Sequence, residues 1–201
     1  METRQSLIID AGPALTFMAA GHRKLLLEVI DSRGSQLQTP EAVVDEVARK
    51  AGQQKRFAGC DRALTGLIAR GQIEMLLDDI NDQALTQEVR RITGVGTAIR
   101  LGESKDLGET MVIAHALKQK AAGEEVRVFI DEWRGQKAAV EHGIKVVSTE
   151  SILIRAISLQ LIADRGEMRK VYDRLRDFDD GLVHIDQTQL LNRERYRLAK
   201  G

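Results

Sequence analysis

The sequence predicts an α/β fold, a three-layer α/β/α sandwich in which helices cover both faces of a central parallel sheet. Short apolar runs rich in β-branched residues alternate along the chain with longer segments of helical periodicity. This alternation is typical of parallel sheets joined by helical crossovers. Two of the apolar runs end in an aspartate. The carboxyl ends of the strands are also where parallel sheets bind ligands. Additional helices are expected after the sheet, at the C-terminal end.

The first part of the chain predicts a strand followed by helices. The run "SLIID" is apolar and β-branched, and the turn residues Gly12 and Pro13 end it. Of the next two helical segments the second ends at Gly34, and Pro40 opens another helix because proline is favoured in a first helical turn. The expected elements are a strand at 6–10, helices at 14–21 and 22–34, an extended segment at 35–40 and a helix at 40–52.

The middle of the chain predicts two helices around a short strand, then a loop. The strand candidate is "IEMLLDD", residues 73–79, and the helix candidates are residues 57–70 and 82–92. Residues 94–108 are rich in glycine and polar side chains, so we expect most of them to form a loop.

The second half predicts two further strands and a helical end. Gly123 ends a helix, and "VRVFID" is a strand that delivers Asp131. The expected elements are a helix at 108–123, strands at 126–131 and 144–149, and helices at 132–143 and 151–163. The last of these is apolar but contains Arg155 and is too short to span a bilayer.

The domain organisation expected from these elements is one α/β domain at 1–160 with an extension. Residues 161–201 form a C-terminal helical extension with a basic tail, packed on or beside the same domain. The tail "RERYRLAK" is either a protein contact or a disordered end.

Composition narrows the function classes. The chain has 201 residues, of which 43% are hydrophobic and 30% charged, as in ordinary globular proteins, and its net charge is zero. Aromatic residues make up only 3%, which argues against an RNA-recognition sheet that stacks bases on surface aromatics. The single cysteine, Cys60, fits a reducing cytoplasm, and the N-terminus has no signal-peptide pattern. Neither a zinc site nor a membrane association is expected.

Four acidic residues are candidates for one site. Asp10 and Asp131 end strands, so they lie at the same edge of a parallel sheet, and Glu46 and Glu109 lie near helix starts. Crowded carboxylates repel one another unless a cation is bound. Oxygen ligands without histidine or cysteine favour Mg²⁺ or Mn²⁺. Phosphodiester hydrolysis is chemistry that uses such a site.

Each candidate also has a simpler interpretation. Asp10 is also a turn residue, Asp45 competes with Glu46, and Glu109 is an acid in a first helical turn, which the helix dipole favours. Asp106 is either a supporting acid or an N-cap. Glu132 is either a partner of Asp131 or a helix-start acid. The interpretation that we favour for Trp133 is packing, and for His115 a satisfied structural residue.

Phosphate contacts require basic side chains near the acidic edge. The RNA-binding candidates lie mostly in loops expected near this edge, and they are Lys55, Arg56, Arg100, Lys105 and Arg134. For Arg134 a surface salt bridge is an equal alternative.

The stretches that carry these acids resemble the motifs of PIN-domain proteins in order and spacing. They are "LIIDAGPAL", "TPEAVVDEV", "DLGETMVIAHAL" and "VFIDEWRGQKAAVEHGIKVVST". The resemblance covers about residues 5–160 and is nearest to a less characterised branch of the family. It implies the α/β/α fold and a metal-dependent ribonuclease, and many such proteins are toxins of VapC-type toxin–antitoxin pairs.

The resemblance also assigns roles to residues. Asp10, Glu46, Glu109 and Asp131 match the acidic quartet, with Asp10, Glu109 and Asp131 as metal ligands. Two positions depart from the pattern: Glu109 stands where many members have aspartate, and Gly12 where a polar residue is frequent. The implied partners are an RNA substrate, an antitoxin protein and a second copy in a homodimer. The competing hypothesis is a PIN-like module that binds RNA or protein without cutting it.

Overall fold

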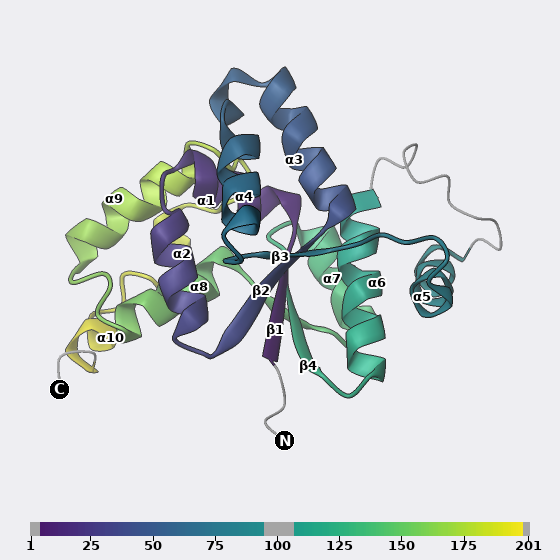
Figure 1. The fold of residues 1–201 in the computed structure, drawn as a ribbon. Helices are drawn as coiled ribbons and strands as arrows, with labels where there is room; N and C mark the ends of the chain where they lie inside the picture. The colour runs from purple at the N-terminus through teal and green to yellow at the C-terminus, as the bar shows by residue number, and fades with distance from the viewer. Residues whose placement is uncertain (1–4, 95–106, 199–201) are drawn as a thin grey trace.

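The computed structural model describes residues 5–94 and 107–198 and contains a five-stranded sheet in which every pairing is parallel (Figure 1). The strand order is β3-β2-β1-β4-β5. The strands are β1 (Gln5–Ile9), β2 (Ser35–Pro40), β3 (Glu74–Leu76), β4 (Glu125–Phe129) and β5 (Lys145–Val147).

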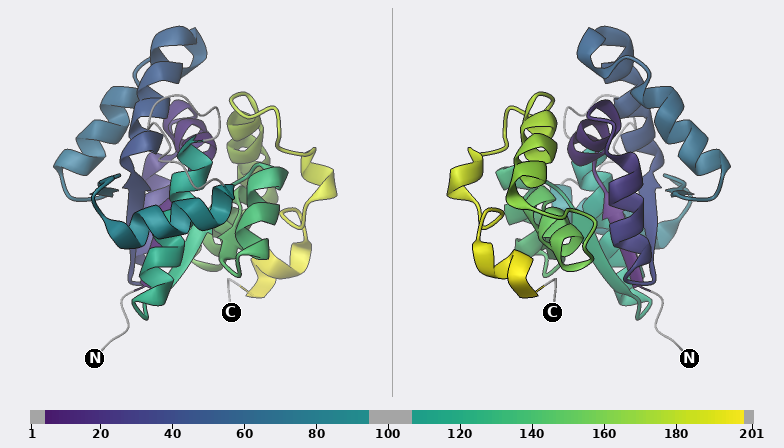
Figure 2. Two further views of the ribbon diagram at one scale, coloured as in Figure 1. Left: turned by 90° about the vertical axis from the view of Figure 1, so that its right-hand side faces the viewer. Right: turned by 90° about the vertical axis from the view of Figure 1, so that its left-hand side faces the viewer.

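Helices cover the sheet on both faces, which confirms the predicted three-layer α/β/α fold. They are α1 (Ala11–Ala19), α2 (Arg23–Asp31), α3 (Glu41–Gln53), α4 (Cys60–Ala69), α5 (Gln83–Thr93), α6 (Leu107–Ala121), α7 (Trp133–Glu141), α8 (Thr149–Ser158), α9 (Arg165–Arg176) and α10 (Arg193–Leu198). Two short 3₁₀ turns are η1 (Lys55–Phe57) and η2 (Ile185–Gln187). Figures 1 and 2 show α6 and α7 on one side of the sheet and α2 and α8 on the other.

The central strand β1 is apolar along most of its length because helices bury both of its faces. Ile8 and Ile9 are fully buried, and so are Val128 and Phe129 of the neighbouring β4. A strand buried on both faces shows a continuous apolar run instead of alternation. Ile9 is aligned with Phe129, and the amide of the next residue, Asp10, donates to the Phe129 carbonyl (3.0 Å).

The strand order places a topological switch between β1 and β4. From β1 the chain moves to β2 and β3 on one side, and it then returns to β4 and β5 on the other. In parallel sheets the crevice at such a switch, outside the carboxyl ends of the strands, is the usual ligand site. Asp10 and Asp131 follow these two strands directly or after one residue.

The C-terminal segment contributes to the main core. Met168, Tyr172 and Leu175 of α9 belong to the same buried cluster as the strands, and so does Tyr196 of α10. The Tyr172 hydroxyl donates to the Val183 carbonyl (3.0 Å) and the Tyr196 hydroxyl to the Leu190 carbonyl (2.7 Å). The basic tail thus begins as a helix that Tyr196 anchors to the core.

Several elements differ from the sequence prediction in length. The strand predicted at 73–79 is reduced to Glu74–Leu76, and the helix predicted at 151–163 is α8, Thr149–Ser158. The helix ends early because Leu159 leaves the helical conformation and Gln160 has a positive φ of 60°. The loop predicted at 94–108 lies mostly outside the described residues. Among the residues that are described, no helix is long and apolar enough to cross a membrane.

Two side chains test the interpretations made from sequence. His115 is buried on α6 and its Nε2 lies 2.8 Å from Oδ1 of the equally buried Asp78, so the satisfied structural role is confirmed. The prediction that Trp133 packs is wrong, because its side chain is 69% exposed. Trp133 is the first residue of α7 and faces away from the core, with the Lys137 Nζ 5.5 Å from its ring centroid.

Candidate active site

The carboxyl edge of the sheet opens into a cleft of about 740 Å³. All four acids predicted from sequence line it: Asp10, Glu46, Glu109 and Asp131. They reach the cleft from four different elements, since two follow strands and two project from helices α3 and α6. The topology therefore collects carboxylates that are up to 121 positions apart in the sequence, from 10 to 131.

Asp10 stands between β1 and the start of α1, with an extended backbone (φ −85°, ψ 166°). Burial raises the pKa of its carboxyl from 3.8 to about 6, opposed by the Ala11 amide, and the nearby charge of Glu46 raises it further. Burial thus disfavours the ionised form of Asp10, and a positive charge bound beside the carboxyl would favour it.

Asp131 follows β4 and is held by Thr149, the first residue of α8. The Thr149 amide donates to Oδ1 (2.8 Å) and its hydroxyl to Oδ2 (2.5 Å). Burial raises the pKa of Asp131 to about 6, the two hydrogen bonds from Thr149 oppose that change, and the charges of Asp179 and Asp10 add to it. Thr149 is fully buried, so its hydroxyl serves this one carboxylate.

Sequence reasoning assigned no role to Thr149. The available signal was its place one residue after strand β5 at a helix start, where the free amides of a first turn bind a carboxylate. Which carboxylate it meets depends on the packing of β5 beside β4, a contact that the sequence alone does not give.

Substituting Thr149 with valine should raise the pKa of Asp131 further, by roughly one pH unit, because a hydrogen bond to a charged group stabilises the ionised form by about 1.5–3 kcal/mol. A ¹³C NMR titration of the Asp131 carboxyl in metal-free protein measures it. Thr149→Ser keeps the hydroxyl and serves as the control. An identical titration curve in Thr149→Val and the wild type would contradict this role.

Glu46 projects from α3 into the cleft, whereas its rival Asp45 is exposed on the same helix. The carboxylate pairs with Lys50 one turn later, at 2.7 Å. It also lies close to the start of α6, since a Cβ added at Gly108 would stand 2.7 Å from its Oε2 and 3.9 Å from Asp10 Oδ1. Glu46, Asp10 and the first turn of α6 are therefore neighbours.

Glu109 lies in the first turn of α6 and reaches across to α7. A Cβ added at Gly135 would lie 2.6 Å from Glu109 Oε2 and 2.8 Å from Cγ2 of the buried Ile130. Gly135 is itself buried. The absence of a side chain at this position is what leaves room for the Glu109 carboxylate beside the residue that precedes Asp131.

Replacing Gly135 with alanine should destabilise the protein by about 1–3 kcal/mol, because the added methyl overlaps both Ile130 and Glu109. Gly52 on α3 is the matched control, since a Cβ there meets nothing within 4 Å. Gly52→Ala should be neutral or stabilise by up to about 1 kcal/mol, the usual gain in a helix. Urea denaturation measures both variants, and equal effects of the same sign would overturn this explanation of Gly135.

The donor chemistry of the cleft fits a hard divalent cation. Its four acids offer only oxygen atoms, the ligands that Mg²⁺ and Mn²⁺ prefer. Asp10 and Asp131 are half-buried carboxylates whose ionisation is costly, the charge of Asp10 adds to that cost at Asp131, and a cation between them would offset it. In residues 5–94 and 107–198, however, no group of three or more His, Cys, Asp or Glu side chains lies close enough to form a ready-made metal centre.

The remaining sequence candidates are divided by the structure. Arg56 lines the cleft and pairs with Asp180 at 3.4 Å, and Glu132 lines it as an exposed residue without a side-chain cap bond. Lys55 and Arg134 are exposed but do not line it. Three candidates, Arg100, Lys105 and Asp106, lie outside the described residues.

Several cleft residues were not predicted. Arg49 and Lys50 of α3 add positive charge, and the segment after α9 adds Phe178, Asp179 and Asp180. The ring of Phe178 lies 6.4 Å from that of Phe57, so this segment is packed against η1. The sequence places residues 178–180 in the C-terminal extension, and only the packing of α9 brings them to the acids.

Comparison with known proteins agrees with this geometry. A sequence model of the PIN domain matches residues 6–182. No curated protein and no solved structure matches the chain. PIN domains are generally nucleases, and PIN-domain nucleases typically use divalent metals. Because the match covers most of the sequence, and the acids of the motifs share one cleft, this chain belongs to the PIN-domain family.

Proposed function

We propose that this protein is a Mg²⁺- or Mn²⁺-dependent endoribonuclease that hydrolyses RNA phosphodiester bonds in the acidic cleft. The observation that carries the proposal is the pair Asp10 and Asp131. The two carboxylates follow neighbouring strands at the topological switch of the sheet, and burial makes both costly to ionise. Such a pair is suited to binding a cation, because a bound positive charge stabilises both carboxylates in their ionised form.

The residues have separate tasks in this proposal. Asp10, Glu109 and Asp131 hold the cation, which when bound supplies an activated water and offsets charge on the scissile phosphate. Thr149 fixes both oxygens of Asp131. Glu46 adds a fourth carboxylate beside Asp10, and Lys50, 2.7 Å from it, limits the negative charge that an incoming phosphate meets.

Support for RNA as the substrate comes from the rim of the cleft. Arg49, Lys50 and Arg56 are cations that line it, and phosphate contacts in nucleic-acid sites are made mainly by such side chains. Trp133 is exposed at the same rim, where an aromatic face can stack an unpaired base.

The test is cleavage of a fluorescent single-stranded RNA by the pure full-length protein. With Mn²⁺ present we expect internal cuts, and with EDTA none; the DNA oligonucleotide of the same sequence measures sugar selectivity. RNA that binds but stays intact with either metal would contradict the proposal and favour the competing function, a PIN-like RNA-binding module.

We also propose that the cleft is where an inhibitory partner acts. A toxin of a toxin–antitoxin pair requires its active groove to be covered, and an extended or helical segment of another chain is a common way to do so. Co-expression with the protein encoded by the neighbouring gene tests this, since a true antitoxin should abolish RNA cleavage and protect the cleft from solvent. A homodimer remains part of the same proposal, to be measured by light scattering.

A further inference from the structure

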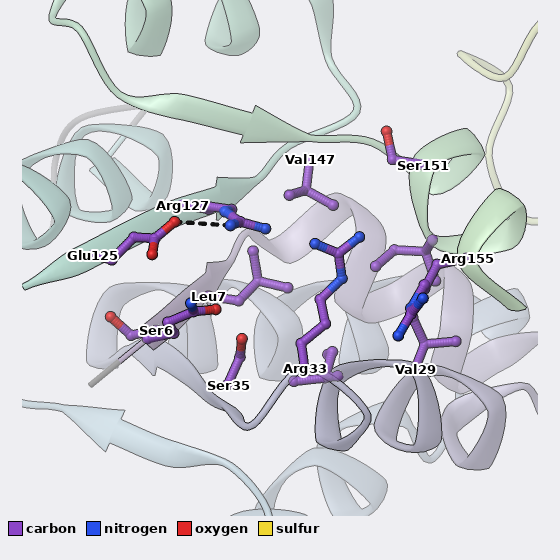
Figure 3. Close-up of a pocket in the computed structure, with 13 residues that line it drawn as sticks. Ser6, Leu7, Val29, Arg33, Ser35, Glu125, Arg127, Val147, Ser151 and Arg155 are labelled. Carbon is purple, nitrogen blue, oxygen red and sulfur yellow. Dashed lines mark hydrogen bonds and ion pairs between the residues drawn. The ribbon is translucent and has the colours of Figure 1, made fainter. Parts of the chain in front are cut away.

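A second pocket lies at the opposite end of the sheet, where β1, β2 and β4 begin. Figure 3 shows this pocket, a small cavity of about 50 Å³. Its lining is mostly apolar and includes Val29 and Val147, and Ser35 and Ser151 add hydroxyl groups. None of its lining residues lines the acidic cleft. The two sites are separated by the length of β1, roughly 15 Å for five residues.

Three arginines from separate elements surround the cavity. Arg33 follows α2, Arg127 lies on β4 and Arg155 on α8. In Figure 3 the guanidinium group of Arg33 lies between those of Arg127 and Arg155. Because helices and a strand from distant parts of the chain bring them together, the cluster is a product of the fold and not of a basic stretch of sequence.

Only one of these arginines has a carboxylate partner. Arg127 donates to Glu125 at 2.8 Å, and Lys145 shares that carboxylate at 3.9 Å. Arg33 is exposed, and in the part of the chain that the structure describes its side chain forms no hydrogen bond or ion pair. The Nε of Arg155 is buried and likewise has no hydrogen-bond partner there, while its terminal nitrogen contacts the Ser158 hydroxyl at 3.4 Å.

Among the described residues, the arrangement leaves one buried donor, the Nε of Arg155, without an acceptor beside positive charge that no carboxylate balances. A buried donor without an acceptor is costly, and native proteins rarely keep one without a reason. Partial burial lowers the pKa of Arg33, and the charges of Arg127 and Arg155 lower it further, which is the effect of like charges held together. An anion in the cavity would relieve both costs.

We propose that this pocket binds the phosphate group of a small ligand, with Arg33 and Arg155 as its principal contacts and Arg127 in support. The cavity of about 50 Å³ is above the minimum size that holds a water molecule, so it suits a single small anion better than a bulky group. Guanidinium groups match phosphate geometry with paired donors. A dianion offsets the excess charge of Arg33 and Arg155 more completely than a carboxylate does.

The site is independent of the nuclease proposal, because it shares no residue with the acidic cleft and requires no metal. The phosphate can be free orthophosphate or the 5′-phosphate of a nucleotide. Both present the same oxyanion to the three arginines, so a binding experiment with each ligand is required to distinguish them.

The experiment follows the melting temperature of the full-length protein, in EDTA, during titration with orthophosphate or adenosine 5′-monophosphate. Sodium acetate at matched ionic strength gives the non-specific response. In the wild type, phosphate should raise the melting temperature beyond acetate and then reach a plateau. In Arg33→Gln the apparent dissociation constant should rise by roughly tenfold or more, since a charge-assisted contact is lost.

Two further variants make the result specific. Arg62→Gln removes the same charge from an exposed position on α4 and should respond to phosphate as the wild type does. Arg155→Lys keeps the charge but removes the buried Nε, and its response should weaken as well. Stronger binding of the nucleotide than of orthophosphate identifies a nucleotide as the source, and equal binding identifies free phosphate.

A phosphate response equal to that of acetate, or one that persists unchanged in both Arg33→Gln and Arg155→Lys, would overturn the proposal. The Asp10→Asn variant, altered only in the acidic cleft, should keep the full phosphate response. Loss of RNA cleavage in that variant together with retained phosphate binding would show that the two sites act independently, so either proposal can fail without the other.

Discussion

Replacing Asp10 with asparagine is expected to lower metal-dependent RNA cleavage by at least about a hundredfold, the scale found when a preorganised electrostatic contact is removed from an active site. Asparagine keeps the shape of the side chain and its place at the end of β1, so the sheet should be unaffected. What it removes is a negative charge from the pair that is proposed to hold the cation. Initial rates with saturating Mn²⁺ measure the effect.

The matched control is Asp45→Asn, because Asp45 carries the same charge on α3, beside Glu46, but is exposed and does not line the cleft. Its cleavage rate should stay within about twofold of the wild type, as for most surface substitutions. Equal activity of Asp10→Asn and Asp45→Asn would contradict the assignment of Asp10.

The second large effect is on stability without metal, and its direction follows from the raised pKa of Asp10. In the unfolded chain this carboxyl titrates near 3.8 and in the folded protein near 6, so the folded state holds the proton more tightly. The folded state keeps its full stability while the Asp10 carboxyl is protonated in both the folded and the unfolded chain, below about pH 4. The contribution of this carboxyl is then lost as the pH rises to about 6. At pH 7 the ionised Asp10 should cost the fold about 3 kcal/mol.

Asp10→Asn cannot ionise and should escape this cost. The difference in unfolding free energy between the variant and the wild type should be near zero at pH 4 and grow to roughly 3 kcal/mol in favour of the variant by pH 7. Urea denaturation in EDTA at several pH values measures it. Other carboxyls contribute equally to the variant and the wild type, so their contributions cancel in this difference. Asp82 and Glu125 are examples with the opposite effect, since Lys118 and Arg127 lower their pKa values. A difference that does not depend on pH would contradict the pKa assigned to Asp10.

Much of the fold could be predicted because the relevant signals are local. The apolar runs that became β1 and β4 are continuous since both faces are buried, and Gly34 and Gly123 mark turns where the backbone has positive φ. The α/β alternation then fixes a parallel sheet, and a parallel sheet sends Asp10 and Asp131 to the same edge.

The parts of the site that escaped prediction depend on contacts between distant segments. Thr149 is bound to Asp131 across 18 positions, and Asp179 reaches the cleft only because α9 packs against the core. The position of Trp133 was misjudged for a related reason. A single tryptophan after a buried strand suggests packing, but the first turn of α7 directs it toward solvent.

The same limit applies to the arginine pocket. Arg33, Arg127 and Arg155 are far apart in sequence and carry no motif, so nothing in their neighbourhoods predicts that they meet. In the sequence Arg155 only interrupts an apolar helix, and the burial of its Nε follows from the packing of α8 against α2.

The most direct test of the central claim is a crystal structure of the protein soaked with Mn²⁺, with anomalous scattering used to locate the ion. We predict one strong anomalous peak in the acidic cleft, with carboxylate oxygens of Asp10 and Asp131 coordinated directly and Glu109 completing the protein ligands, and no such peak in Asp10→Asn. A peak elsewhere on the molecule, or none in the cleft at saturating Mn²⁺, would contradict the assignment of these acids to a metal-dependent nuclease site.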